Sequence, residues 1–142
     1  VRAKNKWGWG DYSSTVQVKA SKVPNQMTAP TTSIDATTGG VKIQWTAPFN
    51  NYDTITKYKI EIREDDSTTN FHEELTYCAG TSPTIISNLY CVIPMSTLQA
   101  SPFNLDLSDL VVVRISAYNS YGYSTTSSEN SSGATIKTIP GQ

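Results

Sequence analysis

Ile115-Ser116-Ala117-Tyr118-Asn119-Ser120-Tyr121-Gly122-Tyr123 is the stretch of this sequence that says most about its fold. A second version of it, Val1-Arg2-Ala3-Lys4-Asn5-Lys6-Trp7-Gly8-Trp9, stands 114 positions earlier (5 against 119). Alanine, asparagine and glycine recur at matching positions, and two tryptophans stand where the later stretch has tyrosines. Residues 23–26 and 139–142 match in the same way, 116 positions apart (24 against 140). A repeat of 114 to 116 residues is therefore expected, running off both ends of the chain.

The strongest local pattern is the alternation of polar and apolar residues, which is typical of half-buried β-strands. It places Val41, Ile43 and Trp45 on one face of their run, and clusters of Gly, Pro, Asn and Ser separate the runs. No long amphipathic helix is predicted, because Pro94 and Pro102 limit residues 95–99 to a turn or two. The predicted strands, which together favour a β-sandwich or barrel, are 15–20, 41–45, 58–63, 111–119 and 134–138.

Composition excludes several classes of protein. The 142 residues suffice for one ordinary domain, and 37% of them are hydrophobic against 16% charged. A formal net charge of −1 provides no basic footprint for nucleic acid. The longest apolar run, residues 110–113, is too short to cross a bilayer. Because Val1 and not Met comes first, we expect an internal segment or a processed fragment.

Cys78 and Cys91 are the two cysteines. Taken alone they fit either two reduced thiols in an intracellular protein or one disulfide in a secreted one.

The order of the motifs resembles the fibronectin type III family. Pro24 and Ala29-Pro30 are similar to its first segment, and residues 41–48 to its second strand, with Trp45 as the core tryptophan. Residues 55–63 are similar to its third strand, with Tyr58 as the core tyrosine, and residues 113–122 to its sixth strand and turn. The resemblance implies an immunoglobulin-like, all-β Greek-key sandwich of seven strands, present as a tandem repeat.

Two departures from the family pattern are visible. Val111 stands where the family usually has a tyrosine that pins the adjacent loop, and extra residues lie between Cys78 and Asp109. This longer form resembles repeats of large surface proteins of ciliated protists. That resemblance implies a Cys78–Cys91 disulfide that clips the extra loop.

These observations predict three parts. Residues 1–22 are the last strands of a preceding repeat with a linker, residues 23–138 are one complete domain, and residues 139–142 begin the next repeat or a linker. The predicted core of the complete domain consists of Ile43, Trp45, Tyr58, Ile60, Leu105, Val113 and Ile115.

Catalytic chemistry is poorly supported. His72-Glu73-Glu74-Leu75 lacks the second histidine of a zinc-protease helix, and no Gly-x-Ser-x-Gly turn occurs. The acidic pairs Asp65-Asp66 and Asp106 with Asp109 lack the spacing of a calcium loop. We predict a protein that is not an enzyme and has no catalytic residues, metal or cofactor.

Two kinds of surface site are predicted. Trp7 and Trp9 could stack with Arg2 and Lys4 or pack the edge of the preceding domain, and with Tyr121 and Tyr123 they form the candidate contact surface. The Asn130-Ser131-Ser132 triplet is a candidate N-glycosylation site in a stretch expected to be exposed.

The predicted function is that of an extracellular or cell-surface structural or adhesive module. Its partners are neighbouring copies arranged head-to-tail, with glycans as candidate partners and with no nucleic acid or direct membrane insertion. The alternatives are a ligand-binding receptor ectodomain, marked by a patch beside Tyr121 and Tyr123, and an accessory module of a secreted glycoside-acting enzyme.

Overall fold

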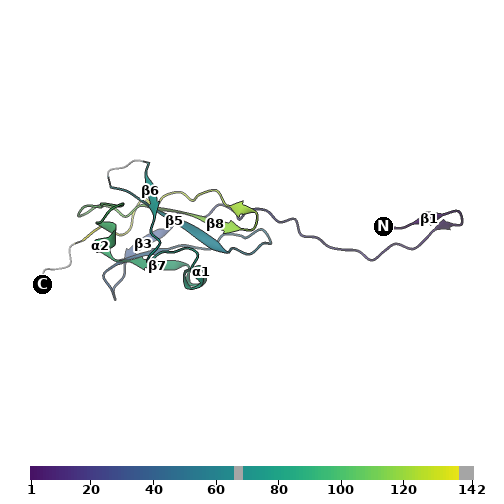
Figure 1. Cartoon of the computed structure of the whole chain (residues 1–142), viewed down its shortest axis with the longest axis horizontal. Coiled ribbons are helices and arrows are strands. Elements are labelled where there is room, and N and C mark those ends of the chain that lie inside the picture. Colours follow the sequence, from purple (N-terminus) through teal and green to yellow (C-terminus); the bar gives the residue numbers. More distant parts are fainter. Residues whose placement is uncertain (66–68, 138–142) are drawn as a thin grey trace.

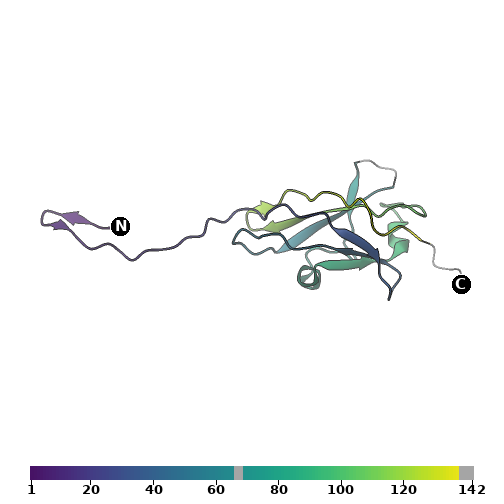
Figure 2. The ribbon, with the colours of Figure 1, turned by 180° about the vertical axis from the view of Figure 1, so that it is seen from behind.

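The structure, a computed structural model, describes residues 1–65 and 69–137. From about residue 23 onward the chain forms two packed β-sheets, and the preceding residues lead away from them as an extended segment that ends in a small hairpin (Figures 1 and 2). The segment before the sandwich joins it at one end of the long axis, and the last described residues, up to Lys137, lie at the other end (Figure 1).

One sheet has three antiparallel strands in the order β3-β4-β7. Alternation explains β4, because Val41 and Ile43 are fully buried while Gln44 faces outward. Ile43 pairs with Cys91 and Val41 with Ile93. The strands are β3 (Thr31–Ile34), β4 (Val41–Gln44) and β7 (Tyr90–Ile93).

The second sheet has four antiparallel strands in the order β6-β5-β8-β9. Its centre is the pair β5 and β8, in which Ile60 lies opposite Ile115 and Tyr58 opposite Ala117. Val113, Ile115 and Ala117 of β8 are fully buried, and so is Val111, two residues before this strand. The strands are β5 (Lys57–Arg63), β6 (Phe71–Glu73), β8 (Val113–Asn119) and β9 (Gly122–Tyr123).

The hydrophobic core fills the space between these two sheets. All seven predicted core residues are buried, which confirms that prediction. Trp45 lies one residue beyond β4 and packs edge-to-face on Tyr58, with ring centroids 5.3 Å apart. The alternation therefore identified the inner face of the central strands correctly.

Two short helices lie in the connections. α2 (Met95–Leu98) is the predicted turn or two. α1 (Pro83–Asn88) was not predicted; it begins at a proline, a residue suited to the first turn, and ends at Leu89 in the left-handed conformation (φ 61°). Ile85 and Ile86 of α1 pack partly against the core.

The predicted strand 134–138 is formed in part within the described residues, as a single antiparallel bridge from Thr135 to Leu110. Ala134 and Ile136 also form backbone hydrogen bonds with residues 108–111, and Thr138 lies outside the described residues. Before this bridge, residues 124–130 follow β8 with three residues for every two of β8. The backbone N–H groups of Ser124, Ser127 and Asn130 donate to the carbonyls of Ala117, Ile115 and Val113. This mismatch in spacing prevents a regular ladder.

The side chains of the same three residues complete the pairing with β8. Ser124 Oγ and Ser127 Oγ accept from the N–H groups of Ala117 (3.1 Å) and Ile115 (2.9 Å). Asn130 Oδ1 accepts from Val113 N–H at 2.7 Å. Side chains therefore satisfy the edge of β8 where a strand would ordinarily do so.

Asn130 is consequently buried, with 7% of its surface exposed, which corrects the prediction of an exposed glycosylation site. Its Nδ2 donates to the carbonyls of Val111 (3.0 Å) and Ser132 (3.1 Å) and contacts Thr32 Oγ1 at 3.4 Å. In the folded domain this nitrogen is therefore engaged as a structural hydrogen-bond donor.

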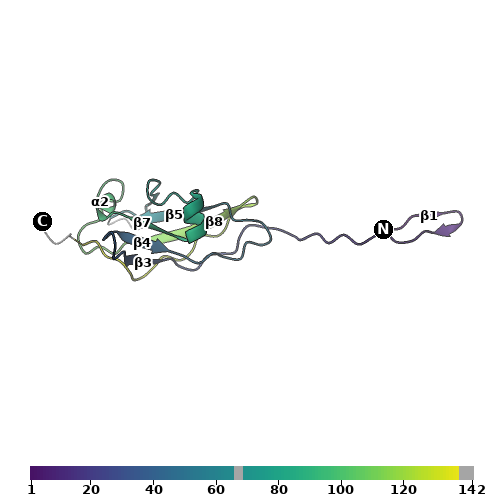
Figure 3. The ribbon, with the colours of Figure 1, turned by 90° about the horizontal axis from the view of Figure 1, so that it is seen from below.

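The N-terminal hairpin consists of β1 (Lys4–Asn5) and β2 (Gly8–Trp9). The strand predicted at 15–20 is wrong for this chain, because these residues make no ladder and are fully open to solvent. A strand needs a neighbour for its N–H and C=O groups, and the described residues provide none here. Figure 3 shows the stretch extended between the hairpin and the sandwich.

Candidate contact surfaces

The N-terminal hairpin repeats the β8–β9 hairpin in three dimensions. Lys4 pairs with Trp9 and Asn5 with Gly8, in the register of Tyr118 with Tyr123 and Asn119 with Gly122. Each position of the first hairpin lies 114 residues before its counterpart (5 against 119). The match found in sequence is therefore also a match in strand pairing.

The turns of the two hairpins share their details. Asn5 Oδ1 accepts from Trp7 N–H at 2.8 Å, and Asn119 Oδ1 accepts from Tyr121 N–H at 3.0 Å. Gly8 and Gly122 have φ angles of 132° and 129°, a region that favours glycine. A two-residue turn closed by asparagine and glycine is thus built twice.

The hydrogen bonds beyond the turn also correspond. Gly10 N–H donates to the Ala3 carbonyl at 2.9 Å, and Ser124 N–H to the Ala117 carbonyl at 2.8 Å. Ser13 N–H and the Val1 carbonyl (2.7 Å) match Ser127 and Ile115 (2.8 Å). Residues 1–13 therefore have the local structure of the closing part of a second sandwich.

One face of this hairpin is apolar and uncovered. Ile115 and Ala117 are fully buried in the sandwich, whereas their counterpart Val1 is 98% exposed and Ala3 is also exposed. Val16 and Val18 further along are 83% and 86% exposed. In the part of the chain that the structure describes, no other residues cover this apolar face of the hairpin.

The opposite face carries the cation–π stack considered from the sequence. The Arg2 guanidinium lies between Trp9 (4.7 Å) and Tyr12 (4.6 Å), and Lys4 Nζ lies 5.4 Å from the Trp9 ring. Trp7 is not part of this stack and instead contacts Lys6 at 5.0 Å. Tyr12 was missed from sequence because it lies outside the matched nonapeptide.

Tyr121 and Tyr123 lie on the sandwich, apart from Trp7 and Trp9, so this structure does not bring the four predicted contact residues together (Figure 1). Tyr123 packs against Tyr118 with centroids 4.8 Å apart, and Lys57 Nζ lies 4.2 Å from the Tyr118 ring. Tyr121 is 59% exposed at the turn. An aromatic and basic patch therefore exists beside this turn.

The end of the sandwich where the chain comes in from the hairpin, here called the N-terminal pole, consists of residues 21–25 and the loops 49–53 and 119–122. Asn51 Nδ2 donates to the Val23 carbonyl at 2.7 Å. Asn119 Nδ2 donates to the carbonyls of Lys22 (2.8 Å) and Asn50 (3.3 Å). Two buried asparagines, neither predicted from sequence, fix the incoming chain to both loops.

Asp53 joins the same two loops. Its Oδ2 accepts from Ser120 N–H at 2.7 Å and from Ser120 Oγ at 2.6 Å. These two hydrogen bonds stabilise the charged form and hold the pKa of Asp53 below its ordinary value.

A charged cluster lies on the outer face of the four-stranded sheet. Glu61 is 7% exposed and pairs with Lys59 (3.1 Å) and with Arg114, whose Nε and Nη2 are both 3.3 Å away. Burial opposes ionisation of Glu61, but the hydrogen bonds from Arg114 and Lys59 outweigh it and lower its pKa. The carboxylate is thus a fixed partner of two cations and is not free to act as a base.

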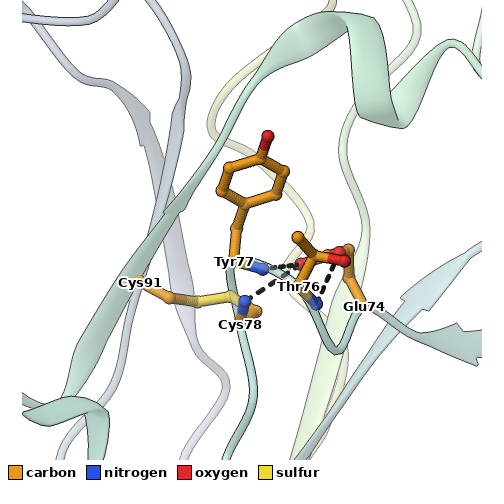
Figure 4. The surroundings of a disulfide bond; sticks show 5 residues. All are labelled: Glu74, Thr76, Tyr77, Cys78 and Cys91. Carbon is orange, nitrogen blue, oxygen red and sulfur yellow. Dashed lines mark hydrogen bonds between the residues drawn. A yellow bond between two sulfur atoms is a disulfide. The ribbon is translucent and has the colours of Figure 1, made fainter.

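The Cys78–Cys91 disulfide implied by the resemblance is present, with Cα atoms 5.3 Å apart (Figure 4). Glu74, buried and unpredicted, accepts the N–H groups of Thr76 (2.9 Å), Tyr77 (2.6 Å) and Cys78 (2.9 Å). It thereby shapes the turn that presents Cys78 to β7.

The remaining candidate residues have structural surroundings. His72 Nε2 lies 3.1 Å from Glu64 Oε2 at the surface. Among residues 1–65 and 69–137 there is no group of three or more His, Cys, Asp or Glu side chains placed to hold a metal ion. None of the helices in those ranges is long and apolar enough to cross a membrane.

Comparison with known proteins supports the fold. No protein-family model and no curated protein matches the chain. Among solved structures, it is similar to the sixth fibronectin type III domain of human fibronectin type III domain containing protein 3, with a TM-score of 0.54 and 18% identity over 87% of this chain and 96% of that one. The sandwich is therefore a fibronectin type III-like fold.

Proposed function

We propose that this chain is part of a head-to-tail array of fibronectin type III-like domains and has a structural or adhesive role outside the cell. The observation that carries the proposal is the N-terminal hairpin, which repeats the strand register, the turn and the adjoining backbone hydrogen bonds of the β8–β9 hairpin while its apolar face is uncovered. An isolated two-stranded hairpin is marginal in water. Residues 1–20 therefore need the remaining strands of a preceding copy.

Several features support the division into residues 1–22, 23–138 and the start of a third copy. The incoming and outgoing ends of the sandwich lie at opposite poles, as a linear array requires (Figure 1). The disulfide fits an oxidising, extracellular setting. The match of residues 139–142 to residues 23–26 is one of sequence alone, because those residues lie outside the described part of the chain.

In this proposal the preceding copy belongs to the same polypeptide, and donation of strands by another subunit is the alternative. Either arrangement is head-to-tail and builds a linear assembly that does not close on itself. A ligand-binding ectodomain is the second candidate function, favoured by the patch of Lys57, Tyr118 and Tyr123 beside the exposed Tyr121.

Hydrogen exchange tests the proposal. We would compare this 142-residue chain with the natural polypeptide extended upstream by one repeat length. The amides of Gly10 and Ser13 should exchange rapidly in the shorter chain and become as protected as those of Ser124 and Ser127 in the longer one. Rapid exchange of Gly10 and Ser13 in both would contradict the array. Protection that rises with the concentration of the shorter chain would indicate strand donation between subunits.

A further inference from the structure

We infer that successive copies in this array abut without a flexible linker, the N-terminal pole of one copy docking on a groove of the copy before it. The inference rests on the proposed function, since it concerns the junction between two copies. It specifies what that function leaves open, namely whether the array is a rod or a flexible string.

Very few residues separate the last core residue expected for the preceding copy from the first residues bound to this copy. With the 116-residue offset that aligns residues 24 and 140, Val18 and Ala20 correspond to Ala134 and Ile136. Ala134 and Ile136 are the last buried apolar residues among those that the structure describes, at 3% and 1% exposure. Ala20 is thus expected to be the last core residue of the preceding copy.

The next residues are already bound to this copy. Ser21 Oγ contacts the Tyr52 carbonyl oxygen at 3.4 Å, and the Lys22 carbonyl accepts from Asn119. Because consecutive Cα atoms are about 3.8 Å apart, Ala20 and Lys22 can be separated by no more than about 8 Å. Two domains joined over that distance must touch.

Residues assigned to the preceding copy also contact the N-terminal pole directly. Lys19, in the stretch that would close the preceding sandwich, places Nζ 4.8 Å from the Tyr52 ring centroid. Tyr52 packs edge-to-face on Phe49, and these two rings are 57% and 53% exposed. The N-terminal pole thus presents an exposed aromatic surface next to the point where the chain enters the sandwich.

The matching surface lies at the other end of the sandwich. A groove of about 350 Å³, here called the C-terminal groove, is lined by Thr38, Gly39, Gly40, Met95, Gln99 and Lys137 among others. Lys137 N–H lies 3.3 Å from Met95 Sδ, so the outgoing chain runs along this groove. At the same offset Lys137 corresponds to Ser21, the residue that contacts Tyr52. One residue would therefore belong to both surfaces, which identifies the next copy as the occupant of the groove.

The backbone of the N-terminal pole is held firmly enough to transmit orientation. Asn51 and Tyr52 both have left-handed backbone conformations, with φ of 52° and 64°. The Asn51 side chain, the Asp53–Ser120 hydrogen bonds and Asn119 hold the loop in that shape. Docking of Tyr52 and Phe49 would consequently fix the angle between two copies.

The experiment uses the natural polypeptide containing the preceding copy and this domain, studied by ¹⁵N relaxation and residual dipolar couplings. We expect both domains to share one alignment tensor and one anisotropic tumbling. Tyr52→Asn, which retains a residue suited to positive φ, should abolish the shared tumbling and leave each domain folded. Tyr77→Asn is the matched control, because Tyr77 is a similarly exposed tyrosine (47%) that belongs to neither surface, and it should change nothing.

Hydrogen exchange of the Gly10 and Ser13 amides distinguishes a failure of the docked junction from a failure of the proposed array. If these amides are protected but the domains tumble independently, the array stands and the docked junction is wrong. The docked junction is also wrong if Tyr52→Asn behaves like Tyr77→Asn. If the amides are unprotected, the proposed function fails and the junction fails with it.

Discussion

Among single residues, Asn130 has a role that its sequence context conceals. A polar residue in a Ser-rich stretch and in a glycosylation triplet is expected to be exposed. The side-chain amide of Asn130 instead forms hydrogen bonds with β8, with β3 and with its own loop. Sequence could not reveal this burial, because the partners lie 17 and 98 positions away.

Replacement of this side chain should be costly. Asn130→Ala leaves Val113 N–H and the Val111 carbonyl without partners, so we expect a loss of about 2 to 4 kcal/mol in the free energy of unfolding. Urea unfolding measures the effect, with the exposed Ser128→Ala as the control. Mass analysis of protein secreted from a glycosylating host should find no glycan on Asn130. A glycosylated protein of unchanged stability would refute the structural role.

Trp45 was assigned correctly from alternation, because its position on the face of Val41 and Ile43 depends only on local spacing. Trp45→Ala should cost about 3 to 5 kcal/mol, as large-to-small core changes do. Chemical denaturation checks the value. A mutant with the wild-type midpoint that has lost a ligand would make Trp45 a binding residue.

Asp53 provides a pH-dependent contact within the N-terminal pole. Hydrogen bonds from Ser120 lower its pKa, so the stabilisation is complete above the ordinary value of 3.8 and is lost as pH falls through the lower folded pKa. The Ser120 amide resonance should titrate with a midpoint below 3.8, and Asp53→Asn should remove that titration. A midpoint at or above 3.8 would show that the bond does not favour the charged form.

At the level of strands and helices, the disulfide joins β7 of one sheet to the segment after β6, which contacts β5 of the other sheet. Cys91 lies in β7, while Cys78 is two residues from Gly80, whose carbonyl accepts from Tyr58 N–H of β5 at 3.0 Å. A Cβ on Gly80 would collide with the Tyr58 carbonyl, so this close approach requires glycine. The bridge therefore fixes the extra segment between the sheets.

Loss of this bridge should be measurable. The cysteines are 13 positions apart, and a loop of that size is stabilised by about 3 kcal/mol in the chain-entropy model. Cys78→Ala with Cys91→Ala should lower the free energy of unfolding by about that amount. Intact-mass analysis of native, unreduced protein after alkylation should find no modified thiol. Two alkylated cysteines would contradict the bridge.

The elements that sequence predicted well are those with strict alternation. β4, β5 and most of β8 follow from it, because apolar residues alternate with polar ones along each strand and the apolar residues face the core. α1 was missed because six residues are too few to show a helical period. Strand 15–20 was predicted wrongly because a strand also needs a neighbouring strand to pair with. The alternation within these six residues does not show whether such a neighbour is present.

Across the full chain, one observation favours the proposal of an array over that of a lone domain with a tail. The hairpin 1–13 has the local bonding of a sandwich's closing strands, and residues 15–20 have the matching apolar pattern. The part of the chain that is described contains no core for them to cover. The sequence repeat predicted that residues 1–13 resemble the closing part of a sandwich. The buried asparagines of the N-terminal pole could not be predicted, because their hydrogen-bond partners lie far away in the sequence.

The most direct test of the array is a high-resolution structure of the native assembly by electron cryomicroscopy, traced through residues 1–20. We expect Val1, Ala3 and Val18 to lie in the core of a preceding copy, with residues 21–22 passing straight into the next. If residues 1–20 instead pack against the domain of their own chain, or remain disordered in solvent, the array is contradicted.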